Sequence, residues 1–157
     1  MCLDTKCTKK DFTIKKHPKN PKLKIGYKVV VQRRNKDIQS GNGMTPIPFK
    51  VACWINEAKV RSRDEQNTKA IEFGCGIGKY PVGFHVFVDK ESAKQFAFLY
   101  RTSIPSKLGG RIIKVYFKRA ITYGLQYNLP IIITDEIYIP HQIPLGATSG
   151  HPCKIRI

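Results

Sequence analysis

The sequence predicts a single α+β domain with a mainly antiparallel, twisted sheet of about five to seven strands and one clear helix. Three observations carry this prediction. Apolar and polar residues alternate in several short segments, as they do in strands with one buried face. Only the segment 90–100 repeats its apolar residues with the spacing of a helix. The chain has 157 residues, of which 41% are hydrophobic, and this suits one domain with a substantial core.

Residues 1–24 are expected to form a flexible basic arm in front of a domain at 25–157. Two prolines in the segment KKHPKNPKLK prevent a continuous helix. Phe12 and Ile14 are expected to anchor the arm to the body. Its lysines repel one another, which favours an extended chain when no partner is bound. These lysines are Lys9, Lys10, Lys15, Lys16, Lys19, Lys22 and Lys24.

The first part of the domain predicts two strands separated by a loop. Alternating side chains predict a strand at 25–34, and the letters SGNG predict that 35–46 is a loop. A second strand is expected at 47–55. For Trp54 we favour packing in the core over a platform on which a base stacks. The polar segment 56–69 predicts an exposed loop or a short helical turn.

The centre of the chain is the segment 74–100, GCGIGKYPVGFHVFVDKESAKQFAFLY, which joins a glycine loop, a strand and a helix. Glycine at every second position of the loop allows positive φ angles. Alternation predicts the strand at 82–88, and a further short strand is expected before the loop at 70–73. Asp89 is the expected N-cap of the helix. The buried stripe of that helix is expected to contain Ala93, Phe96, Ala97 and Tyr100.

The last third of the chain predicts two more strands. Residues 111–119, RIIKVYFKR, alternate clearly, and a turn is expected at 123–124. The apolar run 129–140 predicts a buried strand that is interrupted by the acidic pair at 135–136. That pair is either a bulge or turn with its acids in water, or a carboxylate presented into a site. Residues 141–157 are expected to form an irregular tail.

The charge of the chain favours a polyanionic partner. Lys and Arg total 28 against 11 Asp and Glu, a formal net charge of +17, and the first 36 residues contain twelve of the bases and two of the acids. Nucleic acid fits this imbalance best. RNA or single strands are favoured over duplexes, because the one clear helix lacks the basic side chains that major-groove recognition uses. The alternatives are an acidic host protein and a merely solubilising surface.

Two groups of residues are expected to contact nucleic acid. The arm and the end of the following strand supply cations for phosphates. The strand at 111–119 is expected to point a Lys-Tyr-Lys line outwards, which combines charge with a ring on which bases stack. The complete set is Lys9, Lys10, Lys15, Lys16, Lys19, Lys22, Lys24, Arg33, Arg34, Lys114, Tyr116 and Lys118.

Catalytic and metal-binding motifs give no signal in this chain. The glycine segment precedes a strand rather than a helix, which does not fit a dinucleotide fingerprint, and no GK[ST] follows it. Five cysteines without paired spacing argue against a disulfide framework, and the four histidines are scattered. We therefore expect no catalytic residue, no metal and no cofactor. Without a long apolar run or an apolar region after the N-terminal bases, we also expect no membrane association and a cytoplasmic location.

The segment 83–87, GFHVF, is followed closely by a helix carrying Ala93 and Ala97. This combination resembles a pattern in small uncharacterised proteins of phages and other viruses. The resemblance implies a location in the cytoplasm of an infected host cell, where a basic binding or counter-defence protein would act.

The chain also resembles ADP-ribosyltransferases in the order of three features. These enzymes carry an early Arg or His, a strand–helix centre and a late Glu, and the matching positions are Lys28, His85 and Glu136. Lysine replaces the family's Arg or His, and the central strand has no Ser-Thr-Ser. The resemblance implies an enzyme that uses NAD, in which the early cation holds the dinucleotide and Glu136 stabilises an oxocarbenium-like transition state.

Overall fold

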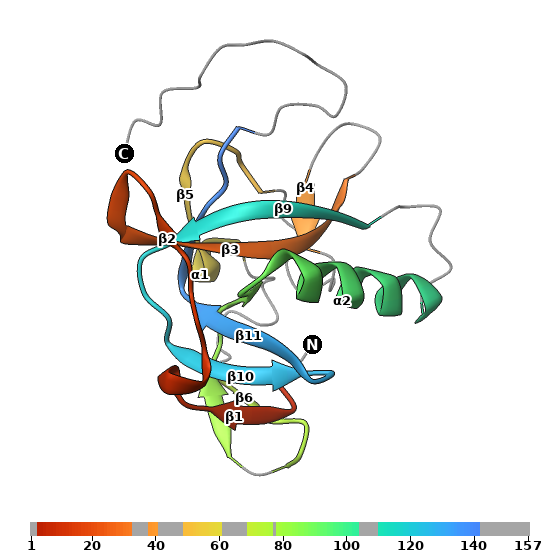
Figure 1. Ribbon diagram of the computed structural model, residues 1–157. Coiled ribbons are helices and arrows are strands. Elements are labelled where there is room, and N and C mark those ends of the chain that lie inside the picture. Colours follow the sequence, from red (N-terminus) through yellow and green to blue (C-terminus); the bar gives the residue numbers. More distant parts are fainter. Residues whose placement is uncertain are drawn as a thin grey trace.

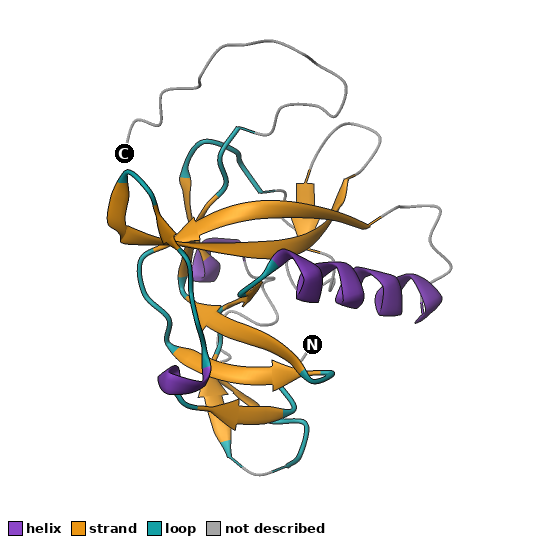
Figure 2. Ribbon diagram, in the orientation of Figure 1, coloured by secondary structure: helices purple, strands orange, loops and turns teal. Residues whose placement is uncertain are grey.

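The computed structural model describes residues 3–32, 38–40, 49–60, 69–76, 78–103 and 110–141. Strands make up most of this part of the chain, as Figure 2 shows. In chain order the elements of the described residues are β1 (Thr5–Cys7), the 3-10 helix η1 (Lys9–Asp11), β2 (Lys16–His17), β3 (Asn20–Gln32), β4 (Ile38–Ser40), β5 (Trp54–Asn56), α1 (Glu57–Val60), β6 (Ala70–Glu72), β7 (Lys79–Pro81), β8 (Phe84–Phe87), α2 (Lys90–Ser103), β9 (Gly110–Phe117), β10 (Thr122–Gln126), β11 (Leu129–Thr134) and β12 (Glu136–Tyr138).

Ten of these strands form one antiparallel sheet, and β6 and β7 form a separate pair. The order in the large sheet is β1-β10-β11-β8-β3-β9-β12-β5, with β2 and β4 also paired to β3. Only Asp135 separates β11 from β12, yet β11 pairs with β8 and β12 pairs with β9. The sheet therefore curls round on itself: the bent segment β11–β12 pairs with β8 at one edge of the β8–β3–β9 unit and with β9 at its other edge. Figure 1 shows β3 and β9 above β10 and β11, with α2 beside them.

The curled sheet separates two hydrophobic cores. Neighbouring residues of β3 belong to different cores, because successive side chains of a strand point to opposite faces. The inner core contains Val30, Phe84, Val86, Val115, Phe117, Ile132, Ile137 and Ile139. The outer core lies between the other face of the sheet and α2, and it contains Val29, Phe87, Ala93, Phe96, Ala97, Ile131 and Ile133.

The helix and its cap confirm the predicted start of the helix and the burial of Ala93, Phe96 and Ala97, whereas the side chain of Tyr100 lies outside the described part of the chain. Asp89 accepts a hydrogen bond from the backbone N–H of Ser92 at 2.7 Å, which satisfies a free amide of the first turn. α2 starts at Lys90, as predicted, and continues to Ser103 rather than ending at residue 100. In the preceding loop, Gly76 and Gly78 have φ angles of 74° and 85°, in the left-handed region that favours glycine.

The strand order depends on a close approach at Gly26. This residue lies where β3 faces both β8 and β9, and a Cβ added there would overlap the side chain of Val86. The same Cβ would lie 3.2 Å from the carbonyl oxygen of Phe87 and 3.3 Å from the ring of Phe117. Only glycine leaves room for three strands at this point.

Several strand predictions differ from the structure. The sheet has ten strands rather than about five to seven, because strands of two or three residues are too short to show alternation. Residues 123–124 lie inside β10, and the turn comes at Tyr127 and Asn128, whose φ angles of 51° and 60° suit a two-residue hairpin. Of the described part of the expected strand at 47–55, the end belongs to β5 and residues 51–53 form bends, while residues 47–48 lie outside the described residues. The expected loop at 35–46 contains β4.

The expected N-terminal arm is largely part of the sheet. β1 pairs with β10, β2 pairs with β3, and β3 begins at Asn20, ahead of the expected boundary between arm and domain. The physical reason lies in the few apolar residues between the lysines. Leu3 is fully buried in the outer core, and Phe12 and Ile14 pack against the inner core. The lysines of residues 3–24 therefore project from a segment that is packed against the domain.

Among the described residues, no helix has the length and the apolar character that crossing a bilayer requires. Of the expected tail, residues 142–157 lie outside the described part of the chain, as do Arg33 and Arg34.

Candidate nucleic-acid interface

A row of aromatic side chains crosses the outer face of the sheet on β5, β12, β9 and β2. Figure 1 shows β5 and β2 at the end of the sheet away from α2. Trp54, Tyr138 and Tyr116 are direct cross-strand partners on β5, β12 and β9. The ring centroids of Trp54 and Tyr138 are 5.6 Å apart, and those of Tyr138 and Tyr116 are 6.3 Å apart in a stacked arrangement. His17 on β2 completes the row, with its ring edge-on to Tyr116 and the two centroids 4.9 Å apart. Strand pairing thus aligns four rings that are distant in the sequence.

Exposure divides this row into a buried half and an accessible half. His17 is 6% exposed and Tyr116 is 8% exposed, whereas Trp54 and Tyr138 are half-buried. Burial, together with the nearby Tyr138 and Tyr27, raises the pKa of Tyr116 above its ordinary value. The predicted outward position of Tyr116 is therefore wrong in part. The rings that a ligand can reach are Trp54 and Tyr138.

A lysine already lies against the accessible tryptophan. The Nζ atom of Lys118 is 4.3 Å from the centroid of the Trp54 ring, within the range of a cation–π interaction. The backbone carbonyl of Lys118 accepts a hydrogen bond from Nζ of Lys24 at 2.8 Å, and this contact joins the ends of β9 and β3. Lys114, four residues before Lys118 on the same face, is exposed. Lys114 and Lys118 therefore lie on the face of the aromatic row, whereas Lys24, whose Nζ is 5.9 Å from the ring centroid of the inner-core residue Phe117, points to the other face of the same strand end.

Lysines of η1, β2 and β3 form the second part of the basic surface. Lys16 is the cross-strand partner of Lys24, and both Lys9 and Lys16 are near enough to repel the charge of Lys24. Burial, followed by this repulsion, lowers the pKa of Lys24. Like charges held at this spacing oppose one another, and an anion between them would relieve the repulsion.

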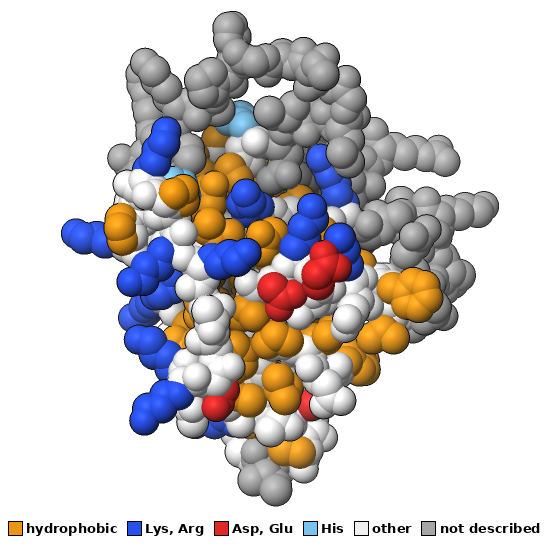
Figure 3. Space-filling model, in the orientation of Figure 1, with side chains coloured by type: hydrophobic (Ala, Val, Ile, Leu, Met, Phe, Trp, Pro, Cys, Tyr) orange, Lys and Arg blue, Asp and Glu red, His pale blue; other side chains and the backbone are white. Residues whose placement is uncertain are grey.

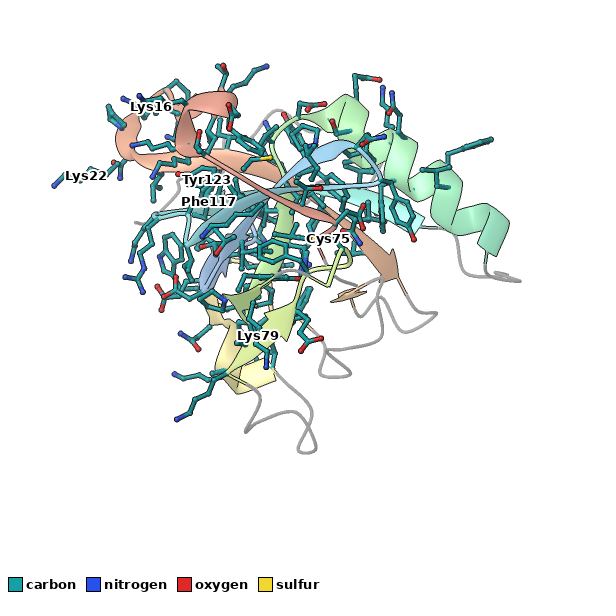
Figure 4. The ribbon with its side chains drawn as sticks, turned by 90° about the horizontal axis from the view of Figure 1, so that it is seen from below. Lys16, Lys22, Cys75, Lys79, Phe117 and Tyr123 are labelled. Atoms are coloured by element: carbon teal, nitrogen blue, oxygen red, sulfur yellow. The ribbon has the colours of Figure 1, made fainter. Side chains whose placement is uncertain are left out.

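The turn between β2 and β3 carries the remaining predicted lysines into solvent. The backbone N–H of Lys19 donates to Nδ1 of His17 at 3.2 Å, and that of Lys22 donates to Oδ1 of Asn20 at 3.2 Å. Figure 4 shows Lys16 and Lys22 extending from this hairpin, well away from Lys79. Lys10 and Lys15 are also exposed. Figure 3 shows Lys and Arg side chains gathered along this side of the molecule.

The acidic pair of the apolar run lies next to the basic surface. Asp135 occupies the bend between β11 and β12, and its carboxylate accepts a 2.6 Å hydrogen bond from Nη2 of Arg119. This bond holds the pKa of Asp135 below its ordinary value. Glu136 follows on β12 and is half-buried on the outer face. Asp135 therefore lies at a bend, as one of the two sequence interpretations expected, but its carboxylate pairs with Arg119 instead of standing alone in water.

A second group of titratable residues is buried inside the sheet. Nζ of Lys28 donates to the backbone carbonyl of His85 at 3.3 Å, and it lies 5.9 Å and 5.5 Å from the ring centroids of Phe49 and Phe84. Burial lowers the pKa of Lys28 to about 8, opposed by the negative charge of Glu57. The apolar surroundings thus favour the neutral amine more than water does.

The ring of His85 points away from Lys28, toward the other core. Its Nε2 lies 3.2 Å from the hydroxyl oxygen of Tyr80, and that oxygen also accepts the backbone N–H of Leu3 at 2.9 Å. Burial and the Lys28 cation lower the pKa of His85 to about 3, so the ring is neutral near pH 7. Lys28 and His85 meet only through the backbone carbonyl. None of the contacts in the described residues joins Glu136 to either of them.

The described residues contain no group of three or more His, Cys, Asp or Glu side chains that could hold a metal ion. Cys7, Cys53 and Cys75 are free thiols.

Comparison of the chain with protein-family models, with curated proteins and with solved structures finds no match. The resemblances to viral proteins and to ADP-ribosyltransferases stay predictions. Any functional argument therefore depends on the geometry of the basic aromatic face.

Proposed function

We propose that this protein binds single-stranded nucleic acid without catalysis, through the outer face that carries Trp54, Tyr138 and the neighbouring lysines. The single observation that supports this most is the position of Lys118, whose ammonium group lies on the accessible tryptophan ring. Single-strand binding uses this combination: rings stack on unpaired bases and cations track the phosphates.

Three properties favour a single strand over a duplex. Trp54 and Tyr138 are half-buried within a sheet face, where a flat unpaired base can reach a ring. Lys118 lies on the ring of Trp54, and Lys24 with the hairpin lysines extends the charge around the same strand end. The described helices present no basic row for the major groove, since α2 packs its apolar stripe on the sheet and carries Glu91 in its first turn.

The test uses the intrinsic fluorescence of Trp54, which is the only tryptophan in the chain. We expect a single-stranded RNA or DNA of about 12 nucleotides, a length within the usual range of single-strand sites, to quench this fluorescence by stacking. The same strand annealed to its complement should quench it much less. The proposal fails if neither strand changes the fluorescence, or if the duplex binds as tightly as the single strand.

If the fluorescence test fails, the alternative is that the basic surface binds an acidic protein. In that case an acidic polypeptide such as polyglutamate would bind with an affinity similar to that of the oligonucleotide, and binding would leave the tryptophan emission unchanged. Polyanion charge alone would then explain the binding.

A further inference from the structure

The accessible aromatic pair lies beside two polar side chains, Asn56 and Glu136. Asn56 and Glu136 are direct cross-strand partners, two residues along from Trp54 and Tyr138 respectively. Between them, Ile55 and Ile137 point into the inner core, so the alternate residues face outward. One patch of the outer face thus combines two rings, an amide and a carboxylate. Cross-strand partners have Cβ atoms about 5 Å apart, so the amide and the carboxylate are neighbours.

The carboxylate of Glu136 is half-buried and makes no hydrogen bond with a described residue. Its backbone carbonyl accepts a hydrogen bond from the hydroxyl of Thr134 at 3.2 Å, but its carboxylate oxygens make no hydrogen bond or ion pair with any residue that the structure describes. Arg119, the nearby cation, is hydrogen-bonded by Asp135, and Glu136 acts on it only through its charge. An acid in the middle of a surface that attracts phosphate lowers the affinity for every polyanion. A carboxylate at this position is best explained by a ligand that donates hydrogen bonds to it.

The amide of Asn56 has a defined orientation. Its Oδ1 accepts the backbone N–H of Ala58 at 3.0 Å, and this leaves the Nδ2 group as a donor toward solvent. The patch therefore presents the two acceptor oxygens of the Glu136 carboxylate next to the donor amide group of Asn56. This pattern is complementary to the Watson–Crick edge of guanine, which offers two adjacent donors, N1–H and the N2 amino group, next to the O6 acceptor.

We infer that this patch is a guanine-preferring subsite of the single-strand interface. The inference depends on the proposed function. The guanine ring stacks on Trp54 or Tyr138, Glu136 accepts from N1–H and from the N2 amino group, and Asn56 donates to O6. Uracil has one N–H between two carbonyl oxygens, and these oxygens would face the carboxylate of Glu136. Cytosine and adenine each offer a single amino group beside a ring acceptor, so neither satisfies both carboxylate oxygens.

The test compares three single-stranded RNAs of one length: all uridine, the same strand with one central guanosine, and the same strand with inosine at that position. Inosine keeps N1–H and O6 but lacks the N2 amino group. Wild-type protein should bind the guanosine strand about tenfold more tightly than the uridine strand, because one bidentate base contact is worth about 1–3 kcal/mol. The inosine strand should bind with intermediate affinity.

The variant Glu136→Gln should lose the guanosine preference while it binds the uridine strand at least as tightly as wild type, because the repulsion of phosphate disappears. Glu72→Gln is the matched control: Glu72 is an exposed acid on the separate β6–β7 pair, and its replacement should leave the preference unchanged. Equal affinity of wild type for all three strands, or a preference that persists in Glu136→Gln, overturns the guanine subsite and leaves single-strand binding intact. If no strand quenches Trp54, both proposals fail.

Discussion

Lys28 is a basic residue inside the inner core, and its burial makes part of the folding free energy depend on pH. The pKa of its amine is lowered from 10.5 to about 8, chiefly by burial. Between those two values the unfolded chain holds a proton that the folded chain has released. The contribution of Lys28 to stability therefore increases as the pH rises from about 8 to about 10.5. Below pH 8 the full free-energy cost of burying the charged amine is present.

The variant Lys28→Met tests this effect, because methionine fills similar space and does not titrate. The difference in the free energy of unfolding between wild type and variant should shift in favour of wild type by about 2 kcal/mol from pH 7 to pH 10. Urea denaturation of both proteins at each pH provides the measurement, and the subtraction cancels the other titrating groups. A difference that stays constant with pH would mean that the amine is already solvated in the folded protein.

Single residues are where the sequence was least informative. Lys28 lies between a tyrosine and a valine of a strand, and alternation alone placed it on a polar face; its burial comes from Phe49 and Phe84, which belong to other segments. Tyr116 alternates in the same way, yet β12 and β2 bring Tyr138 and His17 against it. Such contacts depend on the order of the strands in the sheet, and the alternation of residues within one strand does not reveal that order.

At the scale of elements, one glycine controls how closely three strands pack. Gly26→Ala should destabilise the protein by about 2 kcal/mol, because the new methyl group overlaps Val86 and meets the backbone of Phe87, which a sheet strand cannot move without breaking its pairing. The midpoint of urea denaturation provides the measurement. Gly76→Ala is a useful comparison, since its Cβ would meet nothing within 4 Å and would cost only about 1 kcal/mol from its positive φ. Equal stability of wild type and Gly26→Ala would refute the close approach.

Elements with a long periodic pattern were predictable, and elements that depend on pairing were not. β9 and α2 each have enough residues to show their period, and their predicted positions are close to the observed ones. β1, β2 and β4 have two or three residues each and exist because β10 or β3 pairs with them. The aromatic patch has the same origin: Trp54 and Tyr138 are far apart in the sequence and become neighbours through the β5–β12 pairing. A tryptophan at a predicted strand end was the only local signal for the patch.

At the scale of the whole molecule, the net charge of +17 matters less than its placement. Folding brings Lys9, Lys16 and Lys24 together and sets them beside the strand end that carries Lys118. A uniform excess of charge would attract any polyanion weakly from all sides. Charge that is concentrated at one end of the sheet favours one orientation of a bound strand, and it makes the affinity depend on particular lysines.

Charge reversal separates these two cases. The double variant Lys16→Glu, Lys22→Glu should weaken binding of a single-stranded oligonucleotide. It should also reduce the slope of log affinity against log salt by about 0.7 for each phosphate that the protein no longer neutralises. Lys79→Glu is the control for a reversed charge elsewhere, because Lys79 projects from β7 and lies apart from the hairpin in Figure 4. It should leave the slope nearly unchanged, since a distant exposed charge is screened at moderate salt.

The two outcomes lead to different pictures of the bound strand. If both proteins lose affinity in proportion to the number of charges reversed, the attraction is general and the hairpin does not hold the strand. If only the hairpin variant changes slope, phosphates of the bound strand lie along β2 and β3.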